Sequence, residues 1–369
     1  MKQQNQEIYF NPLTGIRFFL ALMVFIYHFN FFKYRPGFIY DFTGEFHISL
    51  TIFFVLSGFL ISYKYADKVQ LNRKWLTRYF INRFSRIYPI FFIFTILNIA
   101  YAIKLGHLTI NKETGYIVLL NLTLLKGLFD DIKFSGIAQA WSLTVEEIFY
   151  ISAPLIFLFS TNLKRLFLLL LPITLIGFLL VYFFAGWPAF GFFKNMHFMW
   201  HFSYFGRAAE FFFGIALAHL MKNNSAFLLR FKHYTYTGLA GIIGCMLLMA
   251  NLKGGIYEHG FFHPLGKLLN DVPLPFFTCC LFYGLIQEKT LLARLFSMDI
   301  IMLLGKSTYS FYMIHLGVLQ SYLSYFIPGD NLFGYLFILF ILWVLAILIY
   351  KFVEEPMHNY IRSLKVFHS

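Results

Sequence analysis

The sequence predicts an all-α integral membrane protein with about ten transmembrane helices. Of its 369 residues, 59% are hydrophobic and only 13% are charged, and the mean hydropathy is +0.67. A soluble domain carries roughly 25% charged residues. Apolar runs recur from one end of the chain to the other, and no polar stretch between them is long enough to form a separate core. We therefore expect residues 1–369 to form a single transmembrane domain.

Ten apolar segments are candidate spans, because a bilayer core about 30 Å thick requires about 20 mostly apolar residues per helix. They lie at approximately 12–33, 47–63, 87–103, 141–160, 166–185, 204–221, 236–252, 273–287, 300–326 and 332–351. The second and eighth are the shortest. Pro273 and Pro275 open the eighth, and proline suits the first turn of a helix.

The distribution of basic residues predicts the orientation. If the N-terminus is cytoplasmic, the connections on the cytoplasmic side hold 18 lysine and arginine residues and those on the outer side hold 9. Such a bias is typical of cytoplasmic segments, so we expect an even number of spans with both termini in the cytoplasm. The net charge of +13 then reflects topology, and we expect no nucleic-acid partner.

The cysteines indicate neither a disulfide framework nor a metal site. Cys245, Cys279 and Cys280 all lie in apolar segments, and two of them are adjacent. The first apolar run lacks a small-residue cleavage site, so we interpret it as a retained span.

The first span carries two ionisable residues, Arg17 and His28, at the ends of RFFLALMVFIYH. Eleven residues correspond to about three full helical turns, so both side chains project from one face, roughly 16 Å apart along the axis. An ionisable group within the membrane usually faces the bundle interior or a wet cavity. The alternative is an arginine that reaches the inner headgroups and a histidine hydrogen-bonded in the packing.

Two adjacent carboxylates occur in WSLTVEEIFY, at the outer end of the fourth span. Ser142 and Glu146 share a helix face, while Glu147 points about 100° away. We consider all three as candidate catalytic residues. The alternative is a capping role, because an acid in the first turn also suits the positive N-terminus of a helix.

Small residues and arginines mark two further motifs. In IFFVLSGFLIS, Gly58 favours close helix packing, while Ser62 is a candidate for cofactor binding. In RFSR, Arg83 and Arg86 are three residues apart on a helix that enters the membrane from the cytoplasm. Arginine forks suit phosphate oxygens, although an anchor to anionic lipid is the alternative.

The pair Arg207 and Glu210 in RAAEFFFG is interpreted as a structural ion pair. Lys306 and His315 lie in KSTYSFYMIH of the ninth span, and Glu354 and Glu355 end the last span. A glutamate pair at a helix end is usually solvated, so we give it little catalytic weight.

Together these motifs resemble the acyltransferase-3 family of membrane acyltransferases, typified by bacterial O-acetyltransferases of surface polysaccharides. The resemblance rests on the Arg17 and His28 spacing, SGFLIS, RFSR, WSLTVEE, RAAEFFFG and YSFYMIH, in this order from Leu13 to about Pro356. The family's ten-helix core agrees with the span count. Some members add a C-terminal extracytoplasmic esterase-like domain, which we do not expect here because the chain stops soon after Pro356.

The resemblance implies transfer of an acyl group, most often acetyl from acetyl-CoA, to a hydroxyl of a surface carbohydrate. Such acceptors include O-antigen of lipopolysaccharide, capsule and exopolysaccharide. It also implies a multi-pass protein of the plasma membrane, of bacterial inner-membrane type, with membrane lipid, acyl-CoA and carbohydrate as partners and no metal. The family's arginine–histidine motif maps onto Arg17 and His28, and its paired arginines map onto Arg83 and Arg86.

On this basis we expect His28 to act as general base, with a carboxylate such as Glu146 fixing its tautomer. Arg17, Arg83 and Arg86 would hold the phosphates of coenzyme A on the cytoplasmic side. Whether Ser62 or another hydroxyl carries a covalent acyl intermediate stays open. The competing function is a proton-coupled secondary transporter or a flippase for lipid-linked glycans, because these also place ionisable groups inside the membrane.

Overall fold

The structure is a computed structural model that describes residues 10–34, 37–106, 108–109, 111–226, 228, 231–254, 258–327 and 331–364. Within these ranges the regular elements are helices, and the only β-type pairing is one antiparallel bridge between Phe129 and Phe192. The predicted all-α class is therefore confirmed.

The first nine α-helices cover the N-terminal half of the chain. They are α1 (Asn11–His28), α2 (Phe38–Gly44), α3 (Ser49–Tyr65), α4 (Arg73–Lys104), α5 (Lys112–Leu122), α6 (Trp141–Phe159), α7 (Leu163–Leu168), α8 (Leu170–Phe184) and α9 (Met196–Phe202). The other ten are α10 (Tyr204–Lys222), α11 (Tyr234–Leu252), α12 (Pro264–Asp271), α13 (Pro273–Gln287), α14 (Leu291–Phe296), α15 (Asp299–Lys306), α16 (Thr308–Ile314), α17 (Val318–Phe326), α18 (Leu332–Ile349) and α19 (Glu355–Ser363).

Seven helical segments among the described residues are long and apolar enough to cross a membrane. They are Phe38–Lys68, Arg73–Lys104, Ala138–Phe159, Leu163–Phe184, Tyr234–Leu252, Pro264–Gln287 and Leu332–Ser363. The other predicted spans correspond to α1, to α10 and to the α15–α17 region, which do not meet this criterion, so the count of ten stays a prediction. The two chain ends, residues 1–9 and 365–369, lie outside the described residues, and their predicted cytoplasmic position stays a prediction.

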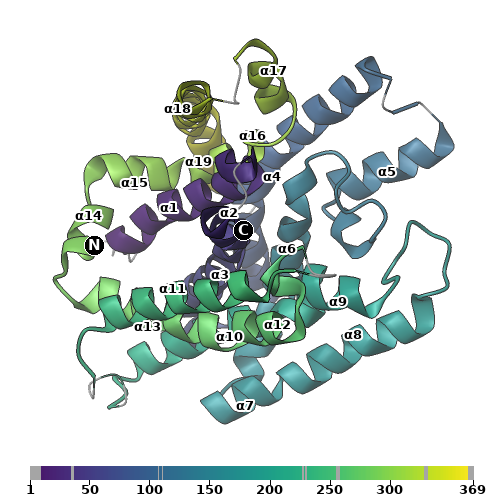
Figure 1. Cartoon of the computed structure of the whole chain (residues 1–369). Helices are drawn as coiled ribbons and strands as arrows, with labels where there is room; N and C mark the ends of the chain where they lie inside the picture. The colour runs from purple at the N-terminus through teal and green to yellow at the C-terminus, as the bar shows by residue number, and fades with distance from the viewer. Residues whose placement is uncertain are drawn as a thin grey trace.

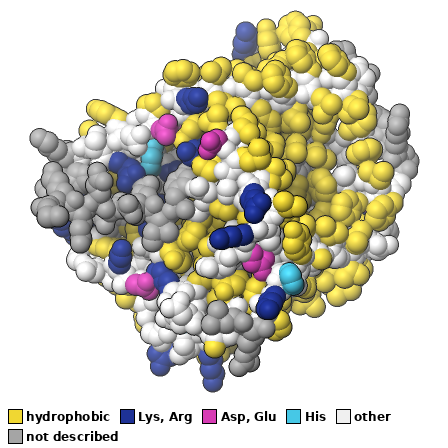
Figure 2. Space-filling view, turned by 90° about the vertical axis from the view of Figure 1, so that its left-hand side faces the viewer, with side chains coloured by type: hydrophobic (Ala, Val, Ile, Leu, Met, Phe, Trp, Pro, Cys, Tyr) yellow, Lys and Arg dark blue, Asp and Glu magenta, His cyan; other side chains and the backbone are white. Residues whose placement is uncertain are grey.

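The helices surround α3, which packs along α10 and also contacts α1, α6 and α13 (Figure 1). Helix α8 lies at the periphery of this bundle, and its exposed side chains include Leu171, Leu175 and Phe183. The face near the N-terminal end of α1 shows lysine and arginine side chains among hydrophobic ones (Figure 2). The arrangement therefore has a buried centre and an outer layer of apolar side chains suited to lipid.

The contact between α3 and α10 depends on two glycines. A Cβ atom on Gly58 would overlap the carbonyl oxygen of Phe211, and a Cβ atom on Gly214 would overlap that of Val55. Small residues let two transmembrane helices approach backbone to backbone. The packing interpretation of Gly58 is thereby confirmed.

The predicted ninth span at 300–326 is not one continuous helix. It is divided into α15, α16 and α17, with breaks at Ser307 and at the turn before Val318, where Gly317 has a φ of +108°. Only glycine adopts that region without strain. Asn98 of α4 stabilises the turn, because its Oδ1 accepts a hydrogen bond from the backbone N–H of Val318 at 3.3 Å.

The predicted outer loop at 104–140 folds back onto the first turn of α6. Lys126 is fully buried, and its ammonium donates to the carbonyl oxygens of Ser135 and of Ile137, the latter at 2.6 Å. Burial lowers the pKa of this lysine to about 7. The backbone N–H of Gly127 also donates to Thr144 Oγ1 at 3.2 Å. The loop thus fixes the helix end that carries WSLTVEE.

Replacing Gly58 with alanine should destabilise the protein by about 1–3 kcal/mol, because the added methyl group forces α3 and α10 apart. The matched control is Gly244→Ala in α11, where nothing lies within 4 Å of the added atom. Unfolding in detergent followed by circular dichroism measures both variants. Equal stability of the two would contradict the close-packing role of Gly58.

Candidate active site

A cavity of about 140 Å³ with both polar and apolar lining residues lies between α1, α3, α4, α6, α15 and α16. We call it the arginine pocket. Its polar lining residues are Arg17, Ser57, Arg83, Arg86, Ser142, Glu146, Tyr150, Lys306, Thr308, Tyr309 and Tyr312. Segments that are far apart in the sequence therefore bring polar side chains together in one cavity, whose remaining lining is apolar.

Three arginines and a lysine make one part of this pocket strongly positive. Arg17 and Arg83 are half-buried, whereas Arg86 is exposed, and all three line the cavity together with Lys306. The guanidinium of Arg83 lies 5.9 Å from the ring centre of Tyr65 and 5.8 Å from that of Tyr150. Such rings attract a cation without neutralising it. Four cationic side chains therefore lie around one cavity.

Glu146 is the carboxylate that lines the arginine pocket. Tyr150, one turn further along α6, donates its hydroxyl hydrogen bond to Glu146 Oε2 at 3.1 Å and lies 2.9 Å from Ser57 Oγ. Glu147 lies outside the lining. Its Oε1 is buried without a hydrogen-bond partner among the described residues. The two adjacent glutamates thus occupy different environments, as their positions on the helix predict.

The other end of the pocket is formed by Ser142 and Tyr312. Their hydroxyl oxygens lie 2.8 Å apart, and Tyr312 also donates to the carbonyl oxygen of Gln139 at 3.0 Å. The side chain of Gln139 returns a hydrogen bond to the carbonyl oxygen of Tyr312 at 2.6 Å. These contacts join the first turn of α6 to α16.

His28 and His315 lie beyond that end. His315 is completely buried, and its Nδ1 donates to the carbonyl oxygen of Tyr312 at 2.9 Å. Its Nε2 has no hydrogen-bond partner among the described residues. The ring centre of His28 is 5.5 Å from that of His315, and His28 itself is exposed at the end of α1. The cavity lining at Ser142 and Tyr312 is thus connected to the two histidines through the backbone of Tyr312 and the ring contact between His315 and His28.

The structure brings together most of the predicted site residues. Arg17, Arg83, Arg86, Glu146 and Ser142 share the arginine pocket. The lining does not include His28, Glu147 or Ser62.

Ser62 was predicted to bind cofactor, but it is buried at the far end of α3. The ammonium of Lys222 lies 3.5 Å from its carbonyl oxygen. Ser57, one of the small residues of the same motif, lines the cavity instead.

Sequence reasoning missed the tyrosines of the pocket. Tyr150 lies four residues after Glu146 and hence on the same helix face, so helical spacing could have identified it. Tyr309 and Tyr312 contact α4 and α6 across the bundle: Tyr309 donates to the carbonyl oxygen of Ile87 at 2.7 Å. Nothing in the local sequence predicts that contact.

Arg207 is buried and structural, as predicted. Arg207 Nε and Nη2 donate to the two carboxylate oxygens of Glu210 at 2.9 and 3.1 Å, and Nη2 also donates to Thr51 at 2.9 Å. Asn270 completes the network through Glu210 Oε1 at 2.9 Å. Protein groups thus accept hydrogen bonds from Nε and Nη2 of this guanidinium.

The fold and the pocket define a helical membrane protein with a cavity lined by several basic side chains. The chain belongs to the acyltransferase-3 family: the family model described as an acyltransferase domain matches residues 11–351.

Curated relatives come from Staphylococcus aureus. A protein of strain COL named "Putative O-acetyltransferase SACOL0978" is 23% identical over 381 residues, which cover 94% of this chain and 57% of the relative. O-acetyltransferase OatA of strain NCTC 8325 / PS 47 is 23% identical over 384 residues, which cover 95% and 57%. The chain thus spans a little over half the length of these relatives. No solved structure matches it.

Replacing Arg86 with glutamine should weaken the binding of inorganic pyrophosphate about three- to tenfold, because a charged donor to the anion is lost. Arg78→Gln is the matched control, since Arg78 is an exposed arginine of the same helix outside the pocket. Isothermal titration of the purified protein measures both. Equal weakening in the two variants would mean that binding reflects general surface charge.

Proposed function

We propose that this protein is a membrane O-acyltransferase that moves an acyl group, by default acetyl, from acyl-CoA to a hydroxyl of a cell-surface carbohydrate. The observation that carries the proposal is the cavity in which Arg17, Arg83 and Arg86 lie together inside an apolar bundle, with His28 at the other end of the helix that carries Arg17. The family membership and the names of the relatives support acyl transfer. By the distribution of basic residues, the arginine end faces the cytoplasm, where coenzyme A is made.

The arginines are suited to the donor. Coenzyme A carries several phosphates, and guanidinium groups bind phosphate oxygens in pairs. Its thioester lies at the end of a long, thin pantetheine arm. Arg17 and His28 are separated by roughly 16 Å along α1, so phosphates held at the arginines leave the thioester free to reach toward His28.

The chemistry then requires one base. His28 accepts the proton of the acceptor hydroxyl while the hydroxyl oxygen attacks the thioester carbonyl carbon. The tetrahedral intermediate collapses, the carbon–sulfur bond breaks, and the imidazolium returns its proton to the departing thiolate. The products are the O-acylated carbohydrate and free coenzyme A, with no net proton released.

His315 is placed to orient this base. Because its Nδ1–H is committed to the carbonyl oxygen of Tyr312, its Nε2 presents a lone pair. A hydrogen bond from His28 to that lone pair would leave the second nitrogen of His28 free to accept a proton. Glu146, expected from the sequence to do this, lines the pocket with the arginines. There its carboxylate balances their charge when the donor is absent.

The alternative is a proton-coupled transporter or a glycan flippase. The two functions are distinguished by incubating detergent-solubilised protein with acetyl-CoA and a carbohydrate acceptor. A transferase releases coenzyme A without any membrane gradient, whereas a carrier does not.

Replacing His28 with alanine should reduce transfer about 10²- to 10⁴-fold, because the reaction loses its general base. The assay follows coenzyme A release by the purified protein. His219→Ala is the control, since His219 lies near the end of α10 and contacts Asn223. Substantial activity in the His28 variant, with normal insertion, would remove His28 from the role of base.

The two carboxylates should respond differently. Glu146→Gln should reduce transfer more than Glu147→Gln, because only Glu146 lines the cavity and receives the hydrogen bond of Tyr150. Transfer rates of the two purified variants, compared at saturating acetyl-CoA, measure the difference. The opposite order would assign the functional carboxylate to Glu147.

A further inference from the structure

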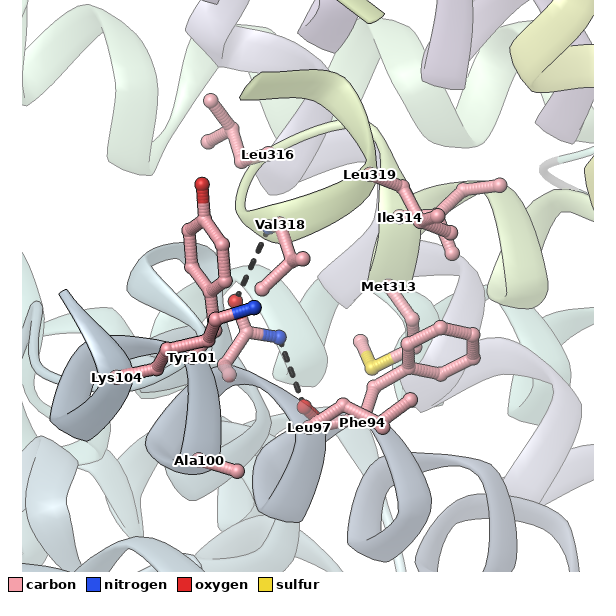
Figure 3. A pocket seen from close by; sticks show the side chains of 11 residues that line it. Phe94, Leu97, Ala100, Tyr101, Lys104, Met313, Ile314, Leu316, Val318 and Leu319 are labelled. Atoms are coloured by element: carbon pink, nitrogen blue, oxygen red, sulfur yellow. Dashed lines mark hydrogen bonds between the residues drawn. The ribbon is translucent and has the colours of Figure 1, made fainter. Parts of the chain in front are cut away.

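A second pocket, of about 380 Å³, opens between the last turns of α4 and the turn that joins α16 to α17. We call it the lateral pocket. Figure 3 shows Leu97, Tyr101 and Lys104 of α4 across from Leu316 and Val318. Its volume lies in the range of sites that bind small molecules. The arginine pocket has a different lining, so the two cavities are separate sites.

The lateral pocket lies at the opposite membrane level from the arginines. Lys104 is 18 residues beyond Arg86 on the same helix, which corresponds to about 27 Å along its axis. The hydrocarbon core of a bilayer is about 30 Å thick. If the arginines lie near one interface, Lys104 therefore lies near the other.

The surroundings of the pocket face lipid. Leu97 is 50% exposed, and its neighbours Ile96 and Leu105 are 45% and 50% exposed on a helix long enough to span the membrane. Most of the lining is apolar, including Phe94 and Met313. Such a surface receives a hydrocarbon chain from the side.

The polar lining residues lie at one end of α4. Lys104 is exposed in the last turn of the helix, and Tyr101 stands one turn earlier. Asn98 is buried and already occupied, because it donates to the carbonyl oxygen of Phe94 at 2.7 Å and accepts from Val318. The amide of Asn98 therefore stabilises the pocket wall, and Lys104 is the charged residue available to a ligand.

We propose that the lateral pocket binds one hydrocarbon chain of an anionic glycerophospholipid, with the lipid phosphate beside Lys104. An apolar chain site that ends in a cation matches a molecule with an apolar chain that ends in an anion. A lysine that merely anchors α4 at the interface would need no cavity beneath it. The proposal does not depend on the acyl-transfer reaction.

A lipid chain bound in the lateral pocket would contact the turn between α16 and α17. Ile314 and Leu316 line the cavity on either side of His315 in the sequence. The turn after them is held to α4 by the hydrogen bond from Val318 to Asn98. A chain lying in the pocket adds apolar contacts to this turn, and it thereby stabilises the backbone that carries His315.

The test is lipid retention, measured by native mass spectrometry after purified protein is equilibrated with equal amounts of phosphatidylglycerol and phosphatidylcholine of identical chains. The wild-type protein should retain phosphatidylglycerol preferentially. Lys104→Gln should lower that preference about fivefold. Leu97→Trp should reduce retention of both lipids, because the indole fills the cavity.

Two matched variants serve as controls. Lys112→Gln removes an exposed lysine of α5, and Ile96→Trp places the same indole on the neighbouring lipid-facing position outside the lining. Both should behave as the wild type. Retention in Leu97→Trp equal to that in Ile96→Trp would overturn the site, and an unchanged preference in Lys104→Gln would overturn the role of the lysine. Displacement of phosphatidylglycerol by an equal amount of a polyprenyl phosphate would reassign the pocket to a carrier lipid.

Discussion

The main constraint on this fold is the free-energy cost of burying guanidinium groups inside an apolar helix bundle. A charge in this environment costs several kcal/mol unless polar or aromatic groups surround it. At Arg207, Glu210 supplies the opposing charge, and Glu210 and Thr51 accept hydrogen bonds from Nε and Nη2. The arginines of the pocket are arranged differently: three of them and Lys306 share a cavity with the single carboxylate of Glu146. The first arrangement joins α10 to α3 and α12, whereas the second places four cationic side chains and one carboxylate around a cavity.

Backbone irregularities accompany the second arrangement. The predicted ninth span at 300–326 is divided into the three helices α15, α16 and α17. A π-helical turn at Tyr350–Glu354 follows α18. Glu354 in that turn accepts a hydrogen bond from Ser310 of α16 at 2.6 Å. Non-helical backbone at membrane depth is tolerated only where protein or a wet cavity covers it. Here the short helix α16 is freed from its neighbours in sequence and held by α4, α6 and α18, so that Tyr312 and His315 point into the interior.

The fold class and several site residues could be predicted from the sequence, because they depend on composition and on spacing within one helix. The class follows from composition, and the common face of Arg17 and His28 follows from helical geometry. The contacts that the sequence did not indicate join distant segments. Ser57 lines the cavity but was not identified as a site residue, since α3 is buried on nearly every side and its pattern does not reveal which face meets the cavity. His28 was expected to pair with a carboxylate, yet its neighbour is His315, 287 residues later. Contacts between distant helices cannot be predicted from the spacing of residues along the chain. Tyr150, in contrast, could have been identified, because it lies four residues after Glu146 on the same helix face.

Helix α4 connects the two cavities and explains why they lie so far apart. Its 32 residues extend about 48 Å, more than the hydrocarbon core requires. Arg83 and Arg86 lie toward one end of this helix and Lys104 at the other. The α16–α17 region packs across it, with Tyr312 lining the arginine pocket and Val318 lining the lateral pocket. A displacement of α16 along α4 would alter both cavities at once. The same packing that brings His315 to His28 therefore also forms a wall of the lateral pocket.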